Sequence, residues 1–223
     1  MKREMGTERK QGFNLLLYLV TDPELSLGRP EEEIVRRAVS AGVTIVQYRD
    51  KNAPTKHMVE KTRILKGICH EKGIPLIVND RLDVALAGGA DGVHLGQDDM
   101  DLADARHILG PEFIIGVSVT TAEEVKRAES EGADYLAANG VFHTPTKPEL
   151  EGSLGIEGVS ALARLSSLPL VAIGGINADN AGDIVKAGAE GVAVVSFIMC
   201  AEDVEGRSRT LLEAMEDRLR IED

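Results

Sequence analysis

The residues that could carry chemistry in this chain stand directly after its short apolar runs. The clearest stretch spans residues 133–147, where an apolar segment breaks at Asn139-Gly140 and leads to two threonines, a proline and a lysine. Two hydroxyls and an ammonium group in a turn held by proline are suited to bind an anion. The residues with this placement are Gln47, Arg49, Lys51, Asn79, Asp80, Asp99, Ser118, Thr144, Thr146, Lys147, Gly175 and Ser196.

Such scattered residues need a scaffold that brings distant strand ends together. Apolar runs typical of buried strands alternate here with segments typical of helices. Strands are expected at Leu15–Val20, Val43–Val46, Leu76–Val78, Val93–Leu95, Phe113–Val117, Tyr135–Ala138, Leu168–Ile173 and Val192–Val195. Helices are expected from Pro30 to Gly42, Thr55 to Lys72, Val84 to Ala87 and Leu102 to Leu109, after a capping box at Thr121–Glu124, from Ile156 to Leu165, after an Asn177 cap, and from Val204 to Leu219.

Eight strand–helix units averaging about 28 residues predict an α/β fold, a single-domain (β/α)8 TIM barrel over residues 13–223. Residues 1–12 lack periodicity and are expected to form a flexible tail. The alternative is an open, doubly wound sheet. The glycine fingerprint of that fold should follow the first strand, where this chain has Thr21-Asp22-Pro23.

Composition restricts the class of protein. The formal net charge of −12 argues against a nucleic-acid partner, which clustered Lys and Arg would bind. Cys69 and Cys200 cannot form a disulfide framework, and no apolar run reaches the roughly 20 residues that a membrane span requires. We therefore expect a cytoplasmic protein without a membrane or nucleic-acid partner; the sequence leaves open whether it forms a homo-oligomer.

In a parallel barrel the carboxyl ends of all strands lie on one face, where active sites are built. The alternation of Gln47, Arg49 and Lys51 places three polar side chains on one face of an extended segment. Basic residues standing alone would be interpreted as a solvated turn, whereas this row of donors suits a diphosphate.

Two carboxylates follow neighbouring strands, Asp80 after the third and Asp99 after the fourth, with Asp98 as a competitor for Asp99. A single Asp at such a place would be interpreted as a helix cap. A pair could share one Mg²⁺ ion, which prefers a few carboxylates together with water and phosphate oxygens.

Gly174-Gly175 and Val195-Ser196 follow the seventh and eighth strands, where many barrels hold a phosphate. His94 lies inside an apolar run and is interpreted as a satisfied core histidine. Neither a Ser-His-Asp nor a Cys-His arrangement is legible, so electrostatic catalysis is favoured over nucleophilic catalysis. A diphosphate subsite with metal and a separate monophosphate subsite indicate the joining of two phosphorylated molecules with loss of pyrophosphate.

The sequence resembles the thiamine phosphate synthase family from about Tyr18 to Ile198. The resemblance rests on several short segments taken together. They are Tyr18-Leu-Val-Thr-Asp22, Gln47-Tyr-Arg-Asp-Lys51, Asn79-Asp-Arg81, Gly92-Val-His-Leu-Gly-Gln97 with Asp99, Gly116-Val-Ser118, Thr144-Pro-Thr-Lys147, Gly174-Gly-Ile176 and Val194-Val-Ser196.

The resemblance implies a transferase that couples hydroxymethylpyrimidine diphosphate to hydroxyethylthiazole phosphate by a dissociative, magnesium-assisted substitution. By the family pattern, the pyrimidine diphosphate would be held by Gln47, Arg49, Lys51, Asn79, Ser118 and Lys147. The same pattern assigns the metal to Asp80 and Asp99, and the thiazole phosphate to Thr144, Thr146, Gly175, Val195 and Ser196. Of these, Arg49, Lys51, Ser118 and Lys147 would serve catalysis.

The chain departs from the family pattern at two places. It has Thr120-Thr121 where the family usually has His-Thr, and Asn139-Gly140 where the family usually has Gly-Pro. One alternative is a thiazole tautomerase-like barrel, which would want a histidine near Ser118 and need not keep the two metal carboxylates. The other is a catalytically silent barrel that binds phosphorylated thiazole as a sensor.

Overall fold

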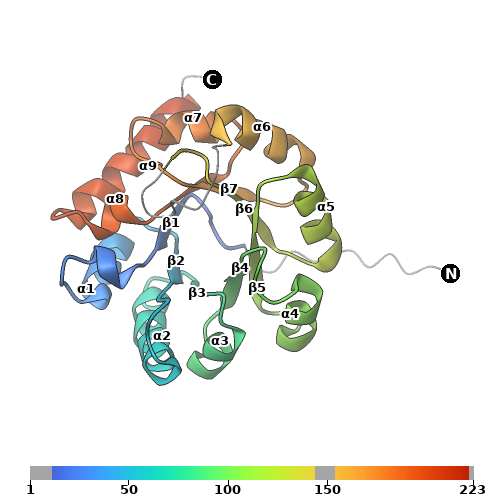
Figure 1. Ribbon diagram of the computed structural model, residues 1–223. Coiled ribbons are helices and arrows are strands. Elements are labelled where there is room, and N and C mark those ends of the chain that lie inside the picture. The colour runs from blue at the N-terminus through green and yellow to red at the C-terminus, as the bar shows by residue number, and fades with distance from the viewer. Residues whose placement is uncertain (1–11, 144–153, 221–223) are drawn as a thin grey trace.

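The computed structural model describes residues 12–143 and 154–220, which form a closed barrel of eight parallel strands surrounded by helices (Figure 1). The strands are β1 (Leu17–Val20), β2 (Ile45–Tyr48), β3 (Leu76–Asn79), β4 (Gly92–Leu95), β5 (Ile114–Val119), β6 (Tyr135–Asn139), β7 (Leu170–Ile173) and β8 (Gly191–Val194). The helices are η1 (Pro23–Leu25), α1 (Glu31–Ser40), α2 (Thr55–His70), α3 (Leu82–Gly88), α4 (Leu102–Leu109), α5 (Ala122–Glu131), α6 (Gly155–Leu165), α7 (Ala181–Lys186), α8 (Ser196–Met199) and α9 (Val204–Arg220).

The barrel closes because β1 pairs with strands from both ends of the chain. Tyr18 lies opposite Ile45 of β2 on one side and Ala193 of β8 on the other. Each further strand pairs in parallel with the next, from β2 through β8. The prediction of a (β/α)8 barrel is confirmed, and the open-sheet alternative is wrong.

Strand side chains alternate between two apolar cores. The inward set fills the barrel and consists of Leu15, Tyr18, Val20, Ile45, Ile77, Ile114, Tyr135, Ala137, Val171 and Ala193. The outward set packs against the surrounding helices, with Leu19, Val46 and Val78 among its buried members. Because both faces of the sheet are buried, the strands are continuous apolar runs in the sequence, which is typical of parallel sheets.

Local signals set most of the helix ends. The predicted capping box is present, with the Thr121 hydroxyl accepting from the Glu124 N–H and the Glu124 carboxylate accepting from the Thr121 N–H. The predicted Asn177 cap is wrong, because α7 begins later and its N-cap is Asn180. Asn177 instead accepts a hydrogen bond from the Asp179 N–H in the preceding turn. Short polar side chains favour such turns as strongly as caps.

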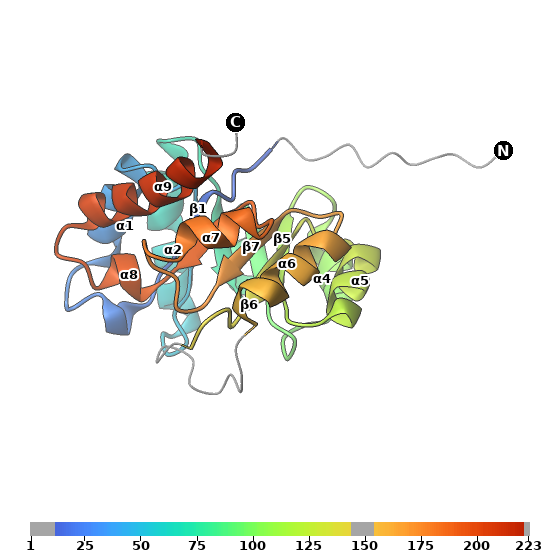
Figure 2. The same ribbon diagram turned by 90° about the horizontal axis from the view of Figure 1, so that it is seen from above.

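Two further features lie outside the predicted pattern. The single-turn helices η1 and α8 were not expected, since segments of three and four residues carry no detectable periodicity. The last helix, α9, packs across α7 and α1 and completes the outer ring (Figures 1 and 2). The predicted tail, residues 1–12, lies outside the described residues except for Gly12. Across the described ranges, no helix has the length and apolar character to cross a membrane.

One inward glycine is required by the packing of the barrel interior. A Cβ atom at Gly116 would lie 2.0 Å from Tyr135 Cζ, so the tyrosine ring occupies the space that a side chain would need. We expect Gly116→Ala to lower the free energy of unfolding by about 2–3 kcal/mol, because the ring or the strand must move. Urea unfolding measures this change.

The matched control is Gly67→Ala in α2, where no atom lies within 4 Å of the added Cβ. This variant should gain up to about 1 kcal/mol from the higher helix propensity of alanine. Equal stability of the two variants would contradict the packing role of Gly116.

Candidate active site

A cavity of about 460 Å³ opens at the carboxyl ends of the strands. It brings together ten of the residues predicted to form the site, and every one of these comes from a strand end or the loop after it. They are Gln47, Arg49, Lys51, Asn79, Asp80, Asp99, Ser118, Gly175, Val195 and Ser196. Thr144, Thr146 and Lys147 lie outside the described residues, so their placement stays a prediction.

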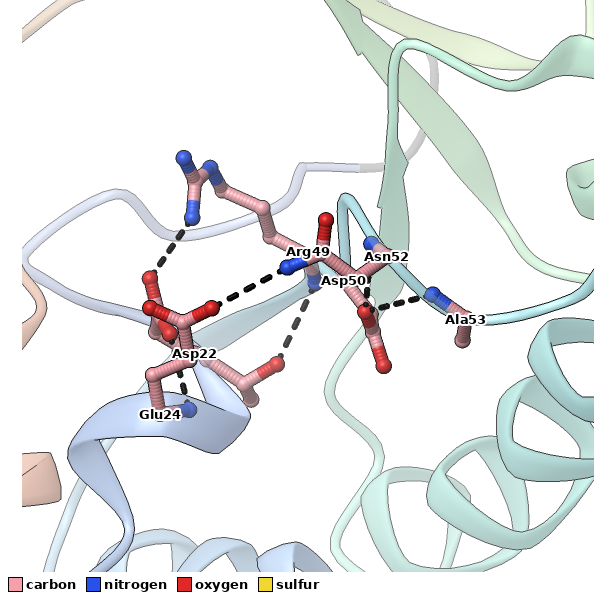
Figure 3. Close-up of polar contacts among 7 residues, drawn as sticks. Asp22, Glu24, Arg49, Asp50, Asn52 and Ala53 are labelled. Carbon is pink, nitrogen blue, oxygen red and sulfur yellow. Dashed lines mark hydrogen bonds and ion pairs between the residues drawn. The ribbon is translucent and has the colours of Figure 1, made fainter.

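The loop after β2 carries the cations and is fixed by its own hydrogen bonds. The Arg49 guanidinium donates through Nη1 to Asp22 Oδ2 at 2.7 Å, and Figure 3 shows it turned toward that carboxylate. The Arg49 N–H donates to the Thr21 hydroxyl, and Asp50 Oδ1 accepts from the N–H groups of Asn52 and Ala53. Only 15 % of the Arg49 side chain is exposed, so Asp22 holds a largely desolvated cation at the cavity wall.

The carboxylate pair predicted to bind a metal is electrostatically coupled. Desolvation by burial is the largest cause that raises the pKa of Asp80 to about 6, and the Asp99 carboxyl adds to it through a hydrogen bond and its charge. The charges of Lys51 and Arg49 act in the opposite direction. Asp80 also has a positive φ of 60°, a left-handed conformation that Asp tolerates better than most residues. The Gly96 N–H donates to Asp99 Oδ2 at 2.6 Å and orients the second carboxylate.

These two carboxylates fit a magnesium ion. Asp80 and Asp99 come from neighbouring strand ends, and a cation between them would offset the burial of the Asp80 carboxylate and the charge of Asp99, which both raise the Asp80 pKa. Among the described residues, no group of three or more His, Cys, Asp or Glu side chains could hold a metal by itself. Mg²⁺ commonly takes one or two carboxylates and completes its shell with water and phosphate oxygens.

The glycine pair after β7 allows the backbone of two loops to meet. A Cβ atom at Gly174 would lie 2.9 Å from the Val141 nitrogen, and one at Gly175 would lie 2.8 Å from the His143 carbonyl oxygen. The Phe142 N–H donates to the Gly174 carbonyl at 3.0 Å and ties the β6 loop to the β7 loop. This contact places the segment that leads toward residue 144 beside the Gly174-Gly175 turn.

The two departures from the family pattern both lie at the cavity. Asn139 and Thr120 line it, and Gly140 follows with a positive φ of 72°. Proline is locked near a φ of about −65°, so the loop leaves β6 in a conformation that the Gly-Pro pattern could not adopt here. The Thr120 hydroxyl donates to Glu124 Oε2 at 3.0 Å, which ties this residue to the cap of α5.

From the sequence, His94 is interpreted as a core histidine, and no catalytic arrangement that contains a histidine is legible. His94 is 7 % exposed and hydrogen-bonded, as a core histidine should be, yet it also lines the cavity. Its Nε2 lies 3.0 Å from Ser118 Oγ, and its Nδ1 lies 3.0 Å from Tyr135 Oη. Because inward side chains recur every second residue, the position of His94 two residues after the inward Gly92 could have indicated this placement.

The raised pKa of Asp80 predicts a pH-dependent effect of Asp80→Asn in metal-free protein. The Asp80 carboxyl has a pKa of 3.8 in the unfolded chain and about 6 in the folded protein, so the folded state holds this proton to a higher pH. The stability that protonated Asp80 contributes is therefore full below pH 3.8 and is lost as the pH rises through about 6. We therefore expect Asp80→Asn to stabilise the protein at neutral pH by about 1–2 kcal/mol after solvent screening is allowed for. Asn also tolerates the left-handed backbone.

Urea unfolding in the presence of a chelator, repeated across acidic and neutral pH, measures this difference. Asp83→Asn is the control with opposite sign, because the hydrogen bond from Arg81 lowers the pKa of Asp83. That variant should lose stability at neutral pH and approach the parent protein as the pH falls. A gain in stability for Asp80→Asn that does not vary with pH would contradict the raised pKa of Asp80.

Comparison with known proteins agrees with this geometry. The family model described as thiamine monophosphate synthase matches residues 17–198. A thiamine-phosphate synthase from Chloroflexus aurantiacus is 47% identical over 195 residues, which cover 87% of this chain and 90% of that protein. One from Syntrophomonas wolfei is 48% identical over 200 residues, covering 90% of this chain and 96% of that protein.

A solved structure gives the same result. The thiamine phosphate pyrophosphorylase from Pyrococcus furiosus superposes with a TM-score of 0.84 at 44% identity, covering 92% of this chain and 97% of that one. The resemblance inferred from short motifs is thus confirmed over most of the chain. Both its sequence and its fold place this chain in the thiamine monophosphate synthase family.

Proposed function

We propose that this chain is a thiamine phosphate synthase, a transferase of thiamine biosynthesis. In this reaction, hydroxymethylpyrimidine diphosphate and hydroxyethylthiazole phosphate give thiamine phosphate and pyrophosphate. The observation that supports the proposal most is the meeting, in one cavity, of two cations, a coupled carboxylate pair and a Gly-Gly turn. This donor set suits a diphosphate with a metal ion on one side and a monophosphate on the other.

The first proposed subsite holds the pyrimidine diphosphate. Arg49 and Lys51 would neutralise phosphate oxygens, while Gln47, Asn79 and Ser118 would supply uncharged hydrogen bonds. Arg49 is paired with Asp22, so a diphosphate would compete with a carboxylate that already orients the guanidinium. Lys147 belongs to the same subsite by the family pattern.

The second proposed subsite holds the thiazole phosphate. Gly175, Val195 and Ser196 lie at the ends of β7 and β8, where barrels commonly bind phosphate through backbone N–H groups. Thr144 and Thr146 complete this subsite by the family pattern. Because the β6 loop is tied to Gly174, the chain reaches residue 143 beside this turn.

The carboxylates of Asp80 and Asp99 would hold Mg²⁺. When bound, the ion would neutralise charge on the leaving pyrophosphate. The protein's own contribution is to fix two oxygen ligands at the cavity mouth, where Lys51 and Arg49 add positive charge.

The proposed reaction breaks the bond between the pyrimidine methylene carbon and the diphosphate oxygen, and the electron pair leaves with pyrophosphate. The lone pair of the thiazole nitrogen then forms the new carbon–nitrogen bond. Arg49, Lys51 and Lys147 stabilise the departing charge electrostatically. Binding both molecules in one cavity removes much of the entropic cost of their encounter.

The two alternatives gain no support from the site. A tautomerase-like reaction would use a histidine near Ser118 for proton transfer. His94 does lie there, but Thr120 stands where the family pattern has a histidine, and the tautomerase reaction has no use for the carboxylates of Asp80 and Asp99. A silent sensor would have no use for the coupled pair of Asp80 and Asp99. A cytoplasmic location stays a prediction.

The proposal predicts product formation in a two-substrate assay. The purified protein, both substrates and Mg²⁺ should yield thiamine phosphate, which is read as thiochrome fluorescence. A chelator should abolish the signal and added Mg²⁺ should restore it, and Asp80→Ala and Asp99→Ala should each lose most of the activity. Binding without turnover by folded protein would favour the sensor, whereas full activity of both variants would refute the metal assignment.

The Arg49 subsite predicts a selective kinetic defect. Arg49→Ala should lower kcat/KM for the pyrimidine diphosphate by about 10- to 100-fold, because one charge-assisted contact is lost. Arg36→Ala is the matched control, since Arg36 forms an exposed ion pair with Glu71 at 3.0 Å. Exposed pairs contribute little, so the control should keep its kinetic constants. Equal effects of the two substitutions would exclude the proposed role of Arg49.

A further inference from the structure

A continuous line of hydrogen bonds crosses the barrel interior from β2 to β5. Gln47 Nε2 donates to Tyr18 Oη at 2.8 Å, and Tyr18 Oη lies 2.8 Å from Tyr135 Oη. Tyr135 Oη lies 3.0 Å from His94 Nδ1, and His94 Nε2 lies 3.0 Å from Ser118 Oγ. These five residues, the interior chain, come from β1, β2, β4, β5 and β6, and Gln47, Tyr18, His94 and Ser118 line the cavity.

The middle of the interior chain is buried. Tyr18 is 1% exposed and Tyr135 is 0% exposed, and burial raises the pKa of both phenols. Their rings meet edge to face, with centroids 6.0 Å apart, and Phe13 packs edge-on against Tyr135. Each phenol therefore stays neutral and has one hydrogen to donate. Once the donor of one hydrogen bond is known, the donor of each following bond is known as well.

Gln47 sets the direction of the hydrogen bonds, because its amide nitrogen can only donate. Tyr18 accepts this hydrogen bond, and its own hydroxyl then donates a hydrogen bond to Tyr135 Oη. Tyr135 in turn donates to His94 Nδ1, which must accept and so carries no hydrogen. The remaining ring proton then lies on Nε2 and is donated to Ser118 Oγ.

With Gln47 Nε2 as the donor to Tyr18, a doubly protonated His94 does not fit this arrangement. With hydrogens on both nitrogens, His94 would donate to Tyr135, and Tyr135 would donate to Tyr18. Tyr18 would then accept from two sides, and its own proton would have no acceptor within the interior chain. A buried donor without a partner costs about 1–3 kcal/mol.

We propose that the interior chain is a positioning device that fixes His94 as the neutral Nε2–H tautomer and thereby makes Ser118 a hydrogen-bond donor to the cavity. The Ser118 oxygen accepts from His94, so its own proton is left for a ligand atom with a lone pair. This step rests on the proposed function, under which the atom that accepts the Ser118 hydrogen bond belongs to the pyrimidine diphosphate. The contact between Ser118 and the ligand is set indirectly, through the chain of hydrogen bonds that runs from Gln47 through Tyr18 and Tyr135 to His94.

The competing interpretation is that these groups only satisfy one another inside the barrel. A purely structural network would work equally well with the Gln47 amide turned over and every bond reversed. His94 would then carry its proton on Nδ1, and Ser118 would donate to Nε2 and offer only lone pairs to a ligand. The two interpretations therefore differ in one observable, the tautomer of His94.

The tautomer can be measured in the ligand-free protein with ¹⁵N-labelled histidine, because protonated and unprotonated ring nitrogens resonate far apart. His94→Asn assigns the signal among the five histidines. We expect the Nε2–H form in the parent protein. In Gln47→Glu, studied well above the titration range of carboxyl groups, the acceptor-only carboxylate should reverse the chain and give the Nδ1–H form.

Tyr135→Phe interrupts the interior chain and should leave His94 as a mixture of both tautomers. Tyr48→Phe is the matched control, because Tyr48 is a buried tyrosine of β2 whose hydroxyl has no partner within the described ranges. Its removal should leave the tautomer and the kinetic constants as they are. An Nδ1–H form in the parent protein, or an unchanged tautomer in Gln47→Glu, would overturn the proposal.

Kinetics add a second readout. Tyr135→Phe should lower kcat/KM about tenfold, the worth of one well-placed hydrogen bond, while the protein stays folded. A normal rate in Tyr135→Phe would also overturn the proposal. The Nε2–H tautomer without any product would refute the proposed reaction alone, because the spectrum needs no substrate. Product formation with the Nδ1–H tautomer would refute only the interior chain.

Discussion

Closure of the parallel sheet is the constraint on which the rest of the structure depends. Tyr18 of the first strand pairs on one side with Ile45 and on the other with Ala193, near the end of the described chain. Once these contacts form, every strand must end on the same face. Residues as distant in sequence as Gln47 and Ser196 then share one cavity.

The same closure creates an interior that must be filled without water. Aliphatic side chains fill most of it, and glycine at position 116 admits the Tyr135 ring. The two phenols and His94 introduce polar atoms into this space, and burying them unpaired would be costly. Their mutual hydrogen bonds remove that cost. The same bonds connect the buried phenols through His94 to Ser118, which lines the cavity.

Periodicity and turn chemistry predicted the barrel and ten of the residues that line the cavity. The ends of β1, β4 and β7 were predicted as found, whereas β2, β3, β5 and β6 run one or two residues further than predicted and β8 ends one residue earlier. These signals are local, so they could not show which groups pair across the barrel. The contact between Arg49 and Asp22 joins the ends of two strands, and that between His94 and Ser118 joins two others. Asn177 was misassigned for the same reason, because its side chain suits a turn as well as a cap and only the three-dimensional path of the chain decides.

The charged groups at the cavity satisfy one another at a cost. Arg49 is held by Asp22, while Asp80 is raised in pKa beside Asp99 and sits in a left-handed conformation. A metal-bound diphosphate would bring both signs of charge at once, offering phosphate oxygens to the cations and a cation to the carboxylates. Such a ligand would offset the burial and the Asp99 charge that disfavour an ionised Asp80, whereas a lone anion would have to approach two carboxylates. Under the proposed function, the arrangement would favour a complex of anion and metal over either partner alone.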